Sequence, residues 1–247
     1  MKIKIIALDF DGVINDSVYE CYLLTLEAFN KMGGKLEKSK ELEKNFRKAR
    51  AFVISAYDYH FISMAIQHER KDFGKVTVKE FDKLREKYNK GKEEFFNNFY
   101  KARKDWRERN MKKWVMANKT FPQASDFKRI SRKYKTLIAT TRDKESALLL
   151  LKEKGFDYKE SGMLSREDGT SKTEHMKKIM GRFSVKPGEI LFIEDMFESA
   201  KKTNAMGVKA VLVSWGYSNQ AQRDKAKKMG IPIIKNDKVF EQIEGLL

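Results

Sequence analysis

The spacing of the strand-like segments restricts the fold of this chain more than any other feature of its sequence. Residues 2–10 form an apolar, isoleucine-rich run that ends at Asp11-Gly12, which is typical of a buried strand followed by a turn. Residues 18–118 contain no proline and no convincing strand, and their aromatic residues recur at helical spacings. From Pro122 onward, strand-like and helix-like segments alternate. The sequence therefore predicts an α/β core whose first strand is separated from the others by an all-helical insertion.

The alternating segments predict one parallel sheet with helices on both faces, which is a doubly wound arrangement. Besides residues 2–10, the expected strands are residues 136–141, 158–163, 190–194, 208–214 and 231–234. The expected helices are residues 123–133, 143–154 and 172–181, one that ends near Gly207, and residues 219–229. We predict two domains, namely a core of residues 1–17 and 119–247 and a helical domain of residues 18–118.

The composition excludes several classes of protein. With 41% hydrophobic and 35% charged residues, the chain has the composition of a globular protein, and no apolar run approaches the roughly 20 residues of a membrane-spanning helix. Asp9 interrupts the apolar start of the chain, which is too short for a signal peptide, so we expect a cytoplasmic protein. The single cysteine, Cys21, excludes an internal disulfide, and three scattered histidines argue against a zinc site. Any metal is therefore expected to be held by oxygen atoms.

The net charge of +17 is concentrated in the insertion. Residues 31–120 hold 25 Lys and Arg against 13 Asp and Glu, whereas residues 1–30 hold 2 against 5. Cations alternate with aromatic residues along residues 101–109, which is one pattern of a nucleic-acid-binding surface. Phe99 and Trp106 also belong to an apolar helical stripe, and we interpret the charges between them as a solvated face. Nucleic-acid binding therefore stays an alternative, as does a positive field that attracts phosphorylated metabolites.

Polar residues gather at the strand ends where doubly wound sheets bind their ligands. If strand geometry persists beyond the first strand, Asp9 and Asp11 point the same way, so that one carboxylate can attack while the other moves a proton. For phosphoryl transfer, Mg²⁺ held by carboxylates, a hydroxyl donor and a lysine form a sufficient set, and the chain supplies carboxylates, hydroxyls and a lysine at these strand ends. The residues concerned are Asp9, Asp11, Thr140, Thr141, Lys172, Glu194 and Asp195.

These segments resemble the motifs of the haloacid dehalogenase-like (HAD) hydrolase superfamily, and most closely those of its phosphoglycolate phosphatase-like branch. The resemblance covers nearly the whole core. The four motifs are similar to IALDFDGVINDS, to TLIATTRDKESALLLLKEKGF, to the lysine of GTSKTEHMKKIM, and to ILFIEDMFESAKKTNAMGVKAVLVSWGY with its following strand. The family implies a Rossmann-like core with a mobile helical cap that closes over the site, and a hinge at residues 13–17.

The resemblance also implies the role of each site residue. Asp9 is the expected nucleophile and Asp11 the general acid and base. Thr140 and Lys172 are the expected phosphate ligands, and Thr140 is preferred to its neighbour Thr141 because its distance to the glycine at the end of the next helix fits the family. Mg²⁺ is expected on Asp195, on the Asp9 carboxylate and on the backbone carbonyl of Asp11.

The fourth motif departs from the family at two positions. Glu194 stands where the family often has glycine, and Ser199 stands where it often has a second acid. The site therefore resembles the variant with two adjacent acids. Glu194 is expected to bind the metal or to support its direct ligands, and Glu198 is the weaker candidate for this role.

The second acid of the first motif selects the reaction. Haloacid dehalogenases and phosphonate-cleaving relatives lack an aspartate two residues after the nucleophile, so Asp11 indicates phosphate-ester chemistry. We predict a phosphatase that acts on a small phosphorylated metabolite through an aspartyl-phosphate. A phosphotransferase such as a sugar-phosphate mutase is the alternative within the superfamily, and the sequence does not define the oligomeric state. Tyr57, Tyr59, His60 and Arg70 are the candidates in the insertion for reaching a substrate, although residues of these types are more often structural.

Overall fold

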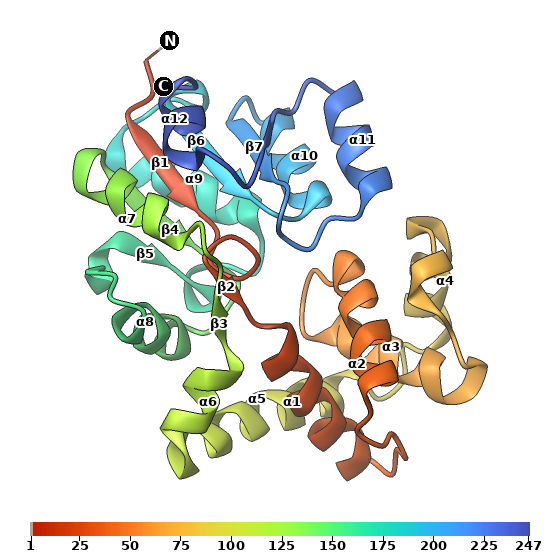
Figure 1. The fold of residues 1–247 in the computed structure, drawn as a ribbon. Helices are drawn as coiled ribbons and strands as arrows, with labels where there is room; N and C mark the ends of the chain where they lie inside the picture. Colours follow the sequence, from red (N-terminus) through yellow and green to blue (C-terminus); the bar gives the residue numbers. More distant parts are fainter. Residues whose placement is uncertain (1) are drawn as a thin grey trace. The chain divides into compact units, whose positions relative to one another are not determined.

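The computed structural model describes residues 2–247, which divide into two compact units. One unit consists of the residues up to Asp16 together with Lys119–Leu247, and the other is Ser17–Asn118. The first contains a sheet with helices, whereas the second is helical (Figure 1). Within the described residues, no helix combines the length and the apolar character required to cross a bilayer.

The sheet of the first unit has six strands in the order β5-β4-β1-β6-β7-β8, and all neighbours are parallel (Figure 1). The first strand of the sequence is therefore central, with Ile6 opposite both Thr136 and Leu191. The parallel α/β sheet expected from the sequence is thus confirmed. The strands are β1 (Ile5–Leu8), β4 (Thr136–Ala139), β5 (Met163–Leu164), β6 (Ile190–Glu194), β7 (Lys209–Val213) and β8 (Ile233–Ile234).

Helices cover both faces of this sheet. On one side α7 packs against α12, and on the other α9 packs against α10, which also contacts α11. Met176 and Ile179 of α9 are buried in a cluster with side chains from β1, β4 and β6. This alternation of strand and helix is what buries both faces of a parallel sheet. The helices are α7 (Ala124–Lys133), α8 (Lys144–Glu153), α9 (Lys172–Phe183), α10 (Phe197–Ala205), α11 (Gln220–Lys228) and α12 (Val239–Glu244).

Several strand boundaries differ from those expected. The strand expected at 158–163 is wrong for most of its length, because Glu160–Gly162 forms a 3₁₀ turn and only Met163–Leu164 pairs with β4. The Tyr158 hydroxyl instead forms a hydrogen bond with the Thr136 hydroxyl. The residues between are charged, small and polar, or glycine, so they offer little to bury against a neighbouring strand.

A short second sheet follows the first strand and was not expected. Asn15–Asp16 forms β2, which pairs antiparallel with β3, Lys119–Thr120. The two chain segments that lead to and from the helical unit therefore lie side by side within the first unit. Two-residue strands have no detectable periodicity, so this pairing was not predictable from the sequence pattern.

The helical unit contains six α-helices and two 3₁₀ turns. Phe81 and Phe95, two of the aromatic residues that recur at helical spacings, are buried as this spacing predicts. Gly91, in the left-handed region at φ 86°, separates the two helices that carry them. The elements are α1 (Val18–Lys31), α2 (Lys40–Ala49), η1 (Arg50–Phe52), α3 (Tyr57–Glu69), η2 (Phe73–Lys75), α4 (Val78–Lys87), α5 (Lys92–Arg109) and α6 (Met111–Ala117).

A buried ion pair joins three helices of this unit. Arg103 of α5 donates from Nε and Nη2 to the two carboxylate oxygens of Glu20 in α1, at 2.9 and 3.2 Å. Trp114 of α6 donates from Nε1 to Glu20 Oε1 over 2.8 Å. The interpretation of the charges between Phe99 and Trp106 as a solvated face is therefore wrong for Arg103, which is buried, and Arg107 just beyond them is buried as well. Part of the positive charge of the insertion therefore stabilises the packing of its own helices.

We expect Glu20→Gln to destabilise the protein by about 3 kcal/mol, because it leaves the buried Arg103 without its counter-charge. Glu27→Gln is the matched control on the same helix, since Glu27 is 51% exposed and lies 3.9 Å from Arg109. Its effect should stay within about 0.5 kcal/mol. Urea denaturation followed by circular dichroism measures both values, and equal effects of the two substitutions would contradict this role of Glu20.

Candidate active site

The residues expected at the site come together because of the order of the strands. Asp9 directly follows β1, Thr140 directly follows β4, and Glu194 is the last residue of β6. Since β4 and β6 are the two neighbours of β1, their carboxyl ends meet at one edge of the sheet. Lys172 is the first residue of α9, a helix that Ser171 opens with a capping box.

Lys172 is the centre of this arrangement. Its Nζ lies 2.5 Å from Asp9 Oδ1, 2.5 Å from the carbonyl oxygen of Ala139, and 3.8 Å from Glu194 Oε2. The backbone amide of Phe10 donates to the same Asp9 oxygen over 2.7 Å. All three charged side chains are buried, so one ammonium group serves two carboxylates in a site with little solvent.

Asp9, Glu194 and Asp195 form a cluster of acids. One carboxylate oxygen from each lies within 4.8 Å of the others. Glycine is required beside this cluster, because a Cβ on Gly12 would lie 2.2 Å from Asp195 Cγ and one on Gly216 would lie 2.3 Å from Asp195 Cβ. Gly12 also has a φ of 94°, which other residues rarely adopt. The Asp-Gly turn after β1 therefore makes room for the fourth-motif aspartate.

Burial of several like charges changes how these groups titrate. Burial raises the pKa of Asp9 to about 7, with a further contribution from Glu194 that Lys172 opposes. Burial likewise raises the pKa of Glu194 to about 7, and the neighbouring Asp195 acts in the same direction. Burial opposes the charged form of Lys172, but the carboxylates of Asp9 and Glu194 outweigh it and raise the pKa of Lys172. The cluster therefore favours an additional positive charge.

The oxygen atoms of the cluster fit a divalent cation. Glu194 Oε1 accepts from the backbone amides of Asp195 and Met196, at 3.0 Å each. Glu194 Oε2 is buried without a hydrogen-bond donor among residues 2–247. A buried carboxylate oxygen of this kind suits a cation, and carboxylates are preferred ligands of Mg²⁺. Asp195 is oriented by the amide of Tyr217, which donates to Oδ2 over 3.0 Å.

The second aspartate lies in a different environment from the first. β1 ends at Leu8, so the strand geometry that would point Asp9 and Asp11 the same way does not persist. Asp11 Oδ1 instead accepts a hydrogen bond from Asn15 Nδ2 over 2.6 Å, and both carboxylate oxygens accept from Arg142 Nη1 at 3.2 Å. Neither partner was predicted. Both lie within four residues of a predicted site residue, but nothing in the sequence indicates that they face Asp11.

The remaining predicted residues have less central places. Thr140 is buried and its Oγ1 accepts from the amide of Arg142 over 3.1 Å, whereas Thr141 is half-buried. Glu198 lies in the first turn of α10, 3.8 Å from Lys201, and does not belong to the acid cluster. Of the two acids considered as helpers of Asp195, Glu194 is the one that lies beside it.

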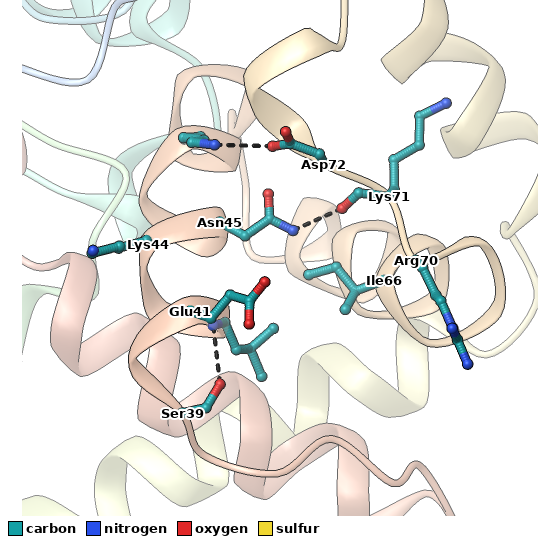
Figure 2. Close-up of a pocket in the computed structure, with 10 residues that line it drawn as sticks. Ser39, Glu41, Lys44, Asn45, Ile66, Arg70, Lys71 and Asp72 are labelled. Atoms are coloured by element: carbon teal, nitrogen blue, oxygen red, sulfur yellow. Dashed lines mark hydrogen bonds and ion pairs between the residues drawn. The ribbon is translucent and has the colours of Figure 1, made fainter.

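The residues of the insertion expected to reach a substrate are mostly structural within their unit. Tyr59 is buried and stacks on Phe99, and His60 is buried with Nε2 2.9 Å from the carbonyl oxygen of Lys90. Tyr57 donates from its hydroxyl to Glu93 over 2.8 Å. Arg70 differs, since it lines a pocket of about 490 Å³. The other residues that line this pocket come from α2 and from the end of α3 and the segment after it (Figure 2). In this pocket Lys48 pairs with Asp72 at 3.0 Å.

Comparisons with known proteins point to a family and to a fold. Residues 3–201 match a family model described as "Hydrolase: haloacid dehalogenase-like hydrolase". No curated protein sequence matches the chain significantly.

Solved structures share the fold over the full length of the chain. A haloacid dehalogenase-like family hydrolase from Streptococcus pneumoniae has a TM-score of 0.64 at 18% identity, with 99% of both chains covered. A predicted phosphoglycolate phosphatase from Haemophilus somnus has a TM-score of 0.67 at 15% identity, with 100% of this chain and 99% of the other covered. A predicted phosphatase from Clostridium acetobutylicum has a TM-score of 0.60 at 14% identity, with 99% and 100% covered. At these identities the likeness concerns the fold alone.

Proposed function

Because the chain belongs to the haloacid dehalogenase-like hydrolase family, we propose that it is a Mg²⁺-dependent phosphomonoesterase that forms an aspartyl-phosphate on Asp9. Membership of the family makes the protein a hydrolase. The observation that most supports phosphate-ester chemistry is the contact of Lys172 Nζ with Asp9 Oδ1 at 2.5 Å, beside two further buried acids. A lysine and carboxylates at one point can bind both the oxygens of a phosphoryl group and a divalent cation.

In the proposed first step, Asp9 attacks the phosphorus atom of a phosphate monoester. Lys172 Nζ and the amide of Phe10 both donate to Oδ1 of this residue, and we assign the attack to Oδ2. The new Oδ2–P bond forms as the ester P–O bond breaks. Asp11 gives a proton to the departing oxygen, while the Thr140 hydroxyl and the Lys172 ammonium bind the phosphoryl oxygens.

In the proposed second step, a water molecule hydrolyses the aspartyl-phosphate. The Asp11 carboxylate takes a proton from the water, the water oxygen bonds to phosphorus, and the bond to Asp9 breaks. Inorganic phosphate leaves, and both aspartates return to their initial state. Lys172 stands in the first turn of α9, whose free backbone amides also favour an anion at this position.

A magnesium ion would be held by Asp9, Glu194 and Asp195 together with the backbone carbonyl of Asp11. Bound there, it neutralises charge on the phosphoryl oxygens. The support for this assignment is the acid cluster, with its buried Glu194 oxygen that lacks a donor.

We propose that the substrate is a small phosphorylated metabolite and that the helical unit acts as a cap that selects it. The antiparallel pairing of β2 with β3 supports this, because two adjacent segments at the ends of an insertion can bend together. Phosphoglycolate belongs in the first panel of substrates, since a similar fold is named for it.

The proposed function is tested by phosphate release from p-nitrophenyl phosphate and from a panel of phosphorylated metabolites. We expect release with Mg²⁺ that stops when a chelator is added and returns with excess Mg²⁺. Transfer of the phosphoryl group to a sugar hydroxyl without net phosphate release would instead indicate a phosphotransferase. No phosphate release from any ester would contradict the proposal.

We expect Asp195→Asn to raise the Mg²⁺ concentration for half-maximal activity more than Glu194→Gln does. Two backbone amides on Oε1 and Lys172 at 3.8 Å offset part of the charge of Glu194, so its loss should matter less. For Asp195→Asn we expect an increase of at least about tenfold, because Mg²⁺ has few protein ligands. Mg²⁺ titration of turnover in both variants checks this, and a larger shift in Glu194→Gln would exchange the two roles.

A further inference from the structure

Arg142 is a buried cation to which the proposed reaction gives no role. Its side chain is 1% exposed, and Nη1 donates to both carboxylate oxygens of Asp11 at 3.2 Å. Asn15 donates to Asp11 Oδ1 as well, over 2.6 Å. The Asp11 side chain itself remains 16% exposed. These contacts therefore fix a carboxyl group that has room to turn toward solvent.

The backbone of Arg142 is anchored to the phosphate-binding side of the site. Its amide donates to Thr140 Oγ1 over 3.1 Å, and its carbonyl oxygen accepts from the amide of Arg166 over 3.1 Å. Thr140 follows β4, whereas Asp11 follows β1, and these strands are neighbours in the sheet. Arg142 thus connects the ends of two strands, one with the expected phosphate ligand and one with the expected proton carrier.

We propose that Arg142 is a positioning residue that holds the Asp11 carboxyl group in place for proton transfer to the leaving oxygen. This rests on the proposed function, in which Asp11 is the proton carrier. A cationic nitrogen that donates to both oxygens of a carboxyl group restrains its orientation as well as its place. Proton transfer needs donor and acceptor within hydrogen-bonding distance, so a carboxyl group that can turn away transfers protons poorly.

The proposal makes the effect of Arg142 depend on the leaving group. An alkyl phosphate such as glycerol phosphate expels an alkoxide, which must be protonated. Dinitrophenyl phosphate expels a stable phenolate that needs no proton. Because kcat/KM covers the steps up to departure of the leaving group, its value for the two esters separates proton donation from the rest of catalysis.

The test is kcat/KM of Arg142→Met for both esters, measured with Mg²⁺. We expect a loss of about 10²-fold for glycerol phosphate, the cost of a misplaced catalytic group, and less than about threefold for dinitrophenyl phosphate. Arg142→Lys keeps the positive charge and should restore part of the loss. If the methionine variant does not fold, Arg142→Lys takes its place, with the same selective pattern at smaller size.

A double variant tests whether Arg142 acts through Asp11. In an Asp11→Asn background, Arg142→Met should change kcat/KM by less than about twofold, because the group that it positions is absent. The proposal would be overturned if the losses of kcat/KM from the two substitutions multiplied in the double variant. Equal losses on both esters, or a change confined to KM, would overturn it as well.

Arg129→Met is the control, because Arg129 is 53% exposed. This variant should keep the wild-type ratio of kcat/KM between the two esters. If the wild-type protein were inactive on both esters, the proposed function would be contradicted. If the wild-type protein were active and Arg142→Met lowered kcat/KM equally for both esters, only the role of Arg142 would be contradicted.

Discussion

Asp9→Asn is expected to abolish phosphate release, with a loss of at least about 10³-fold, while the protein stays folded. The asparagine side chain has nearly the same shape but supplies no attacking carboxylate. It keeps a carbonyl oxygen that can accept the 2.5 Å contact of Lys172 Nζ, so the packing around it should survive. Steady-state kinetics and the circular dichroism spectrum of the purified variant measure the two parts of this expectation.

Asp224→Asn is the matched control, because Asp224 is exposed on α11 and its Oδ1 accepts from Gln220. This variant should keep wild-type turnover. If folded Asp9→Asn protein retained activity comparable to the control, a mechanism with Asp9 as nucleophile would be excluded.

Lys172→Met is expected to lower turnover by about 10²- to 10³-fold, the usual effect of removing one group that stabilises transition-state charge. The substitution also leaves Asp9 and Glu194 without their ammonium partner, at 2.5 and 3.8 Å in the wild type. Breaking a buried pair in this way costs about 3 kcal/mol of folding free energy. Added Mg²⁺ should recover part of this stability, because a cation in the acid cluster replaces the lost charge.

Lys177→Met, five residues further along α9, is the control, since Lys177 is exposed. Thermal denaturation with Mg²⁺ and with chelator compares the two variants. If the melting temperature of Lys172→Met did not respond to Mg²⁺ more strongly than that of the control, Lys172 would not be the charge partner of the proposed metal site.

The main features of the core were predictable because they follow from local patterns. The apolar run that ends at Asp11-Gly12 is typical of a buried strand, and the polar residues at the ends of β1, β4 and β6 meet because these parallel strands are neighbours in the sheet. The capping box at Ser171 marks the start of α9, which places Lys172 in its first turn. Motif spacing therefore indicated which residues gather, before any tertiary contact was known.

Contacts between distant polar residues were not predictable in the same way. Arg142 and Asp11 are 131 positions apart, and Arg103 and Glu20 are 83 apart. An arginine within a helical pattern is usually solvated, so periodicity assigned Arg103 to a solvated face, whereas its charge is paired inside the unit. The short strands β2 and β5 were missed or misplaced because two residues carry no period.

The most direct test of the account is to identify the residue that carries the phosphoryl group during turnover. Wild-type protein is mixed with Mg²⁺ and a good substrate, quenched in acid within one turnover, digested and examined by mass spectrometry. We predict one phosphoryl group on the peptide that contains Asp9, and none on that peptide from Asp9→Asn protein treated in the same way. A phosphoryl group on another residue, or steady phosphate release with no phosphorylated peptide at any quench time, would contradict nucleophilic attack by Asp9.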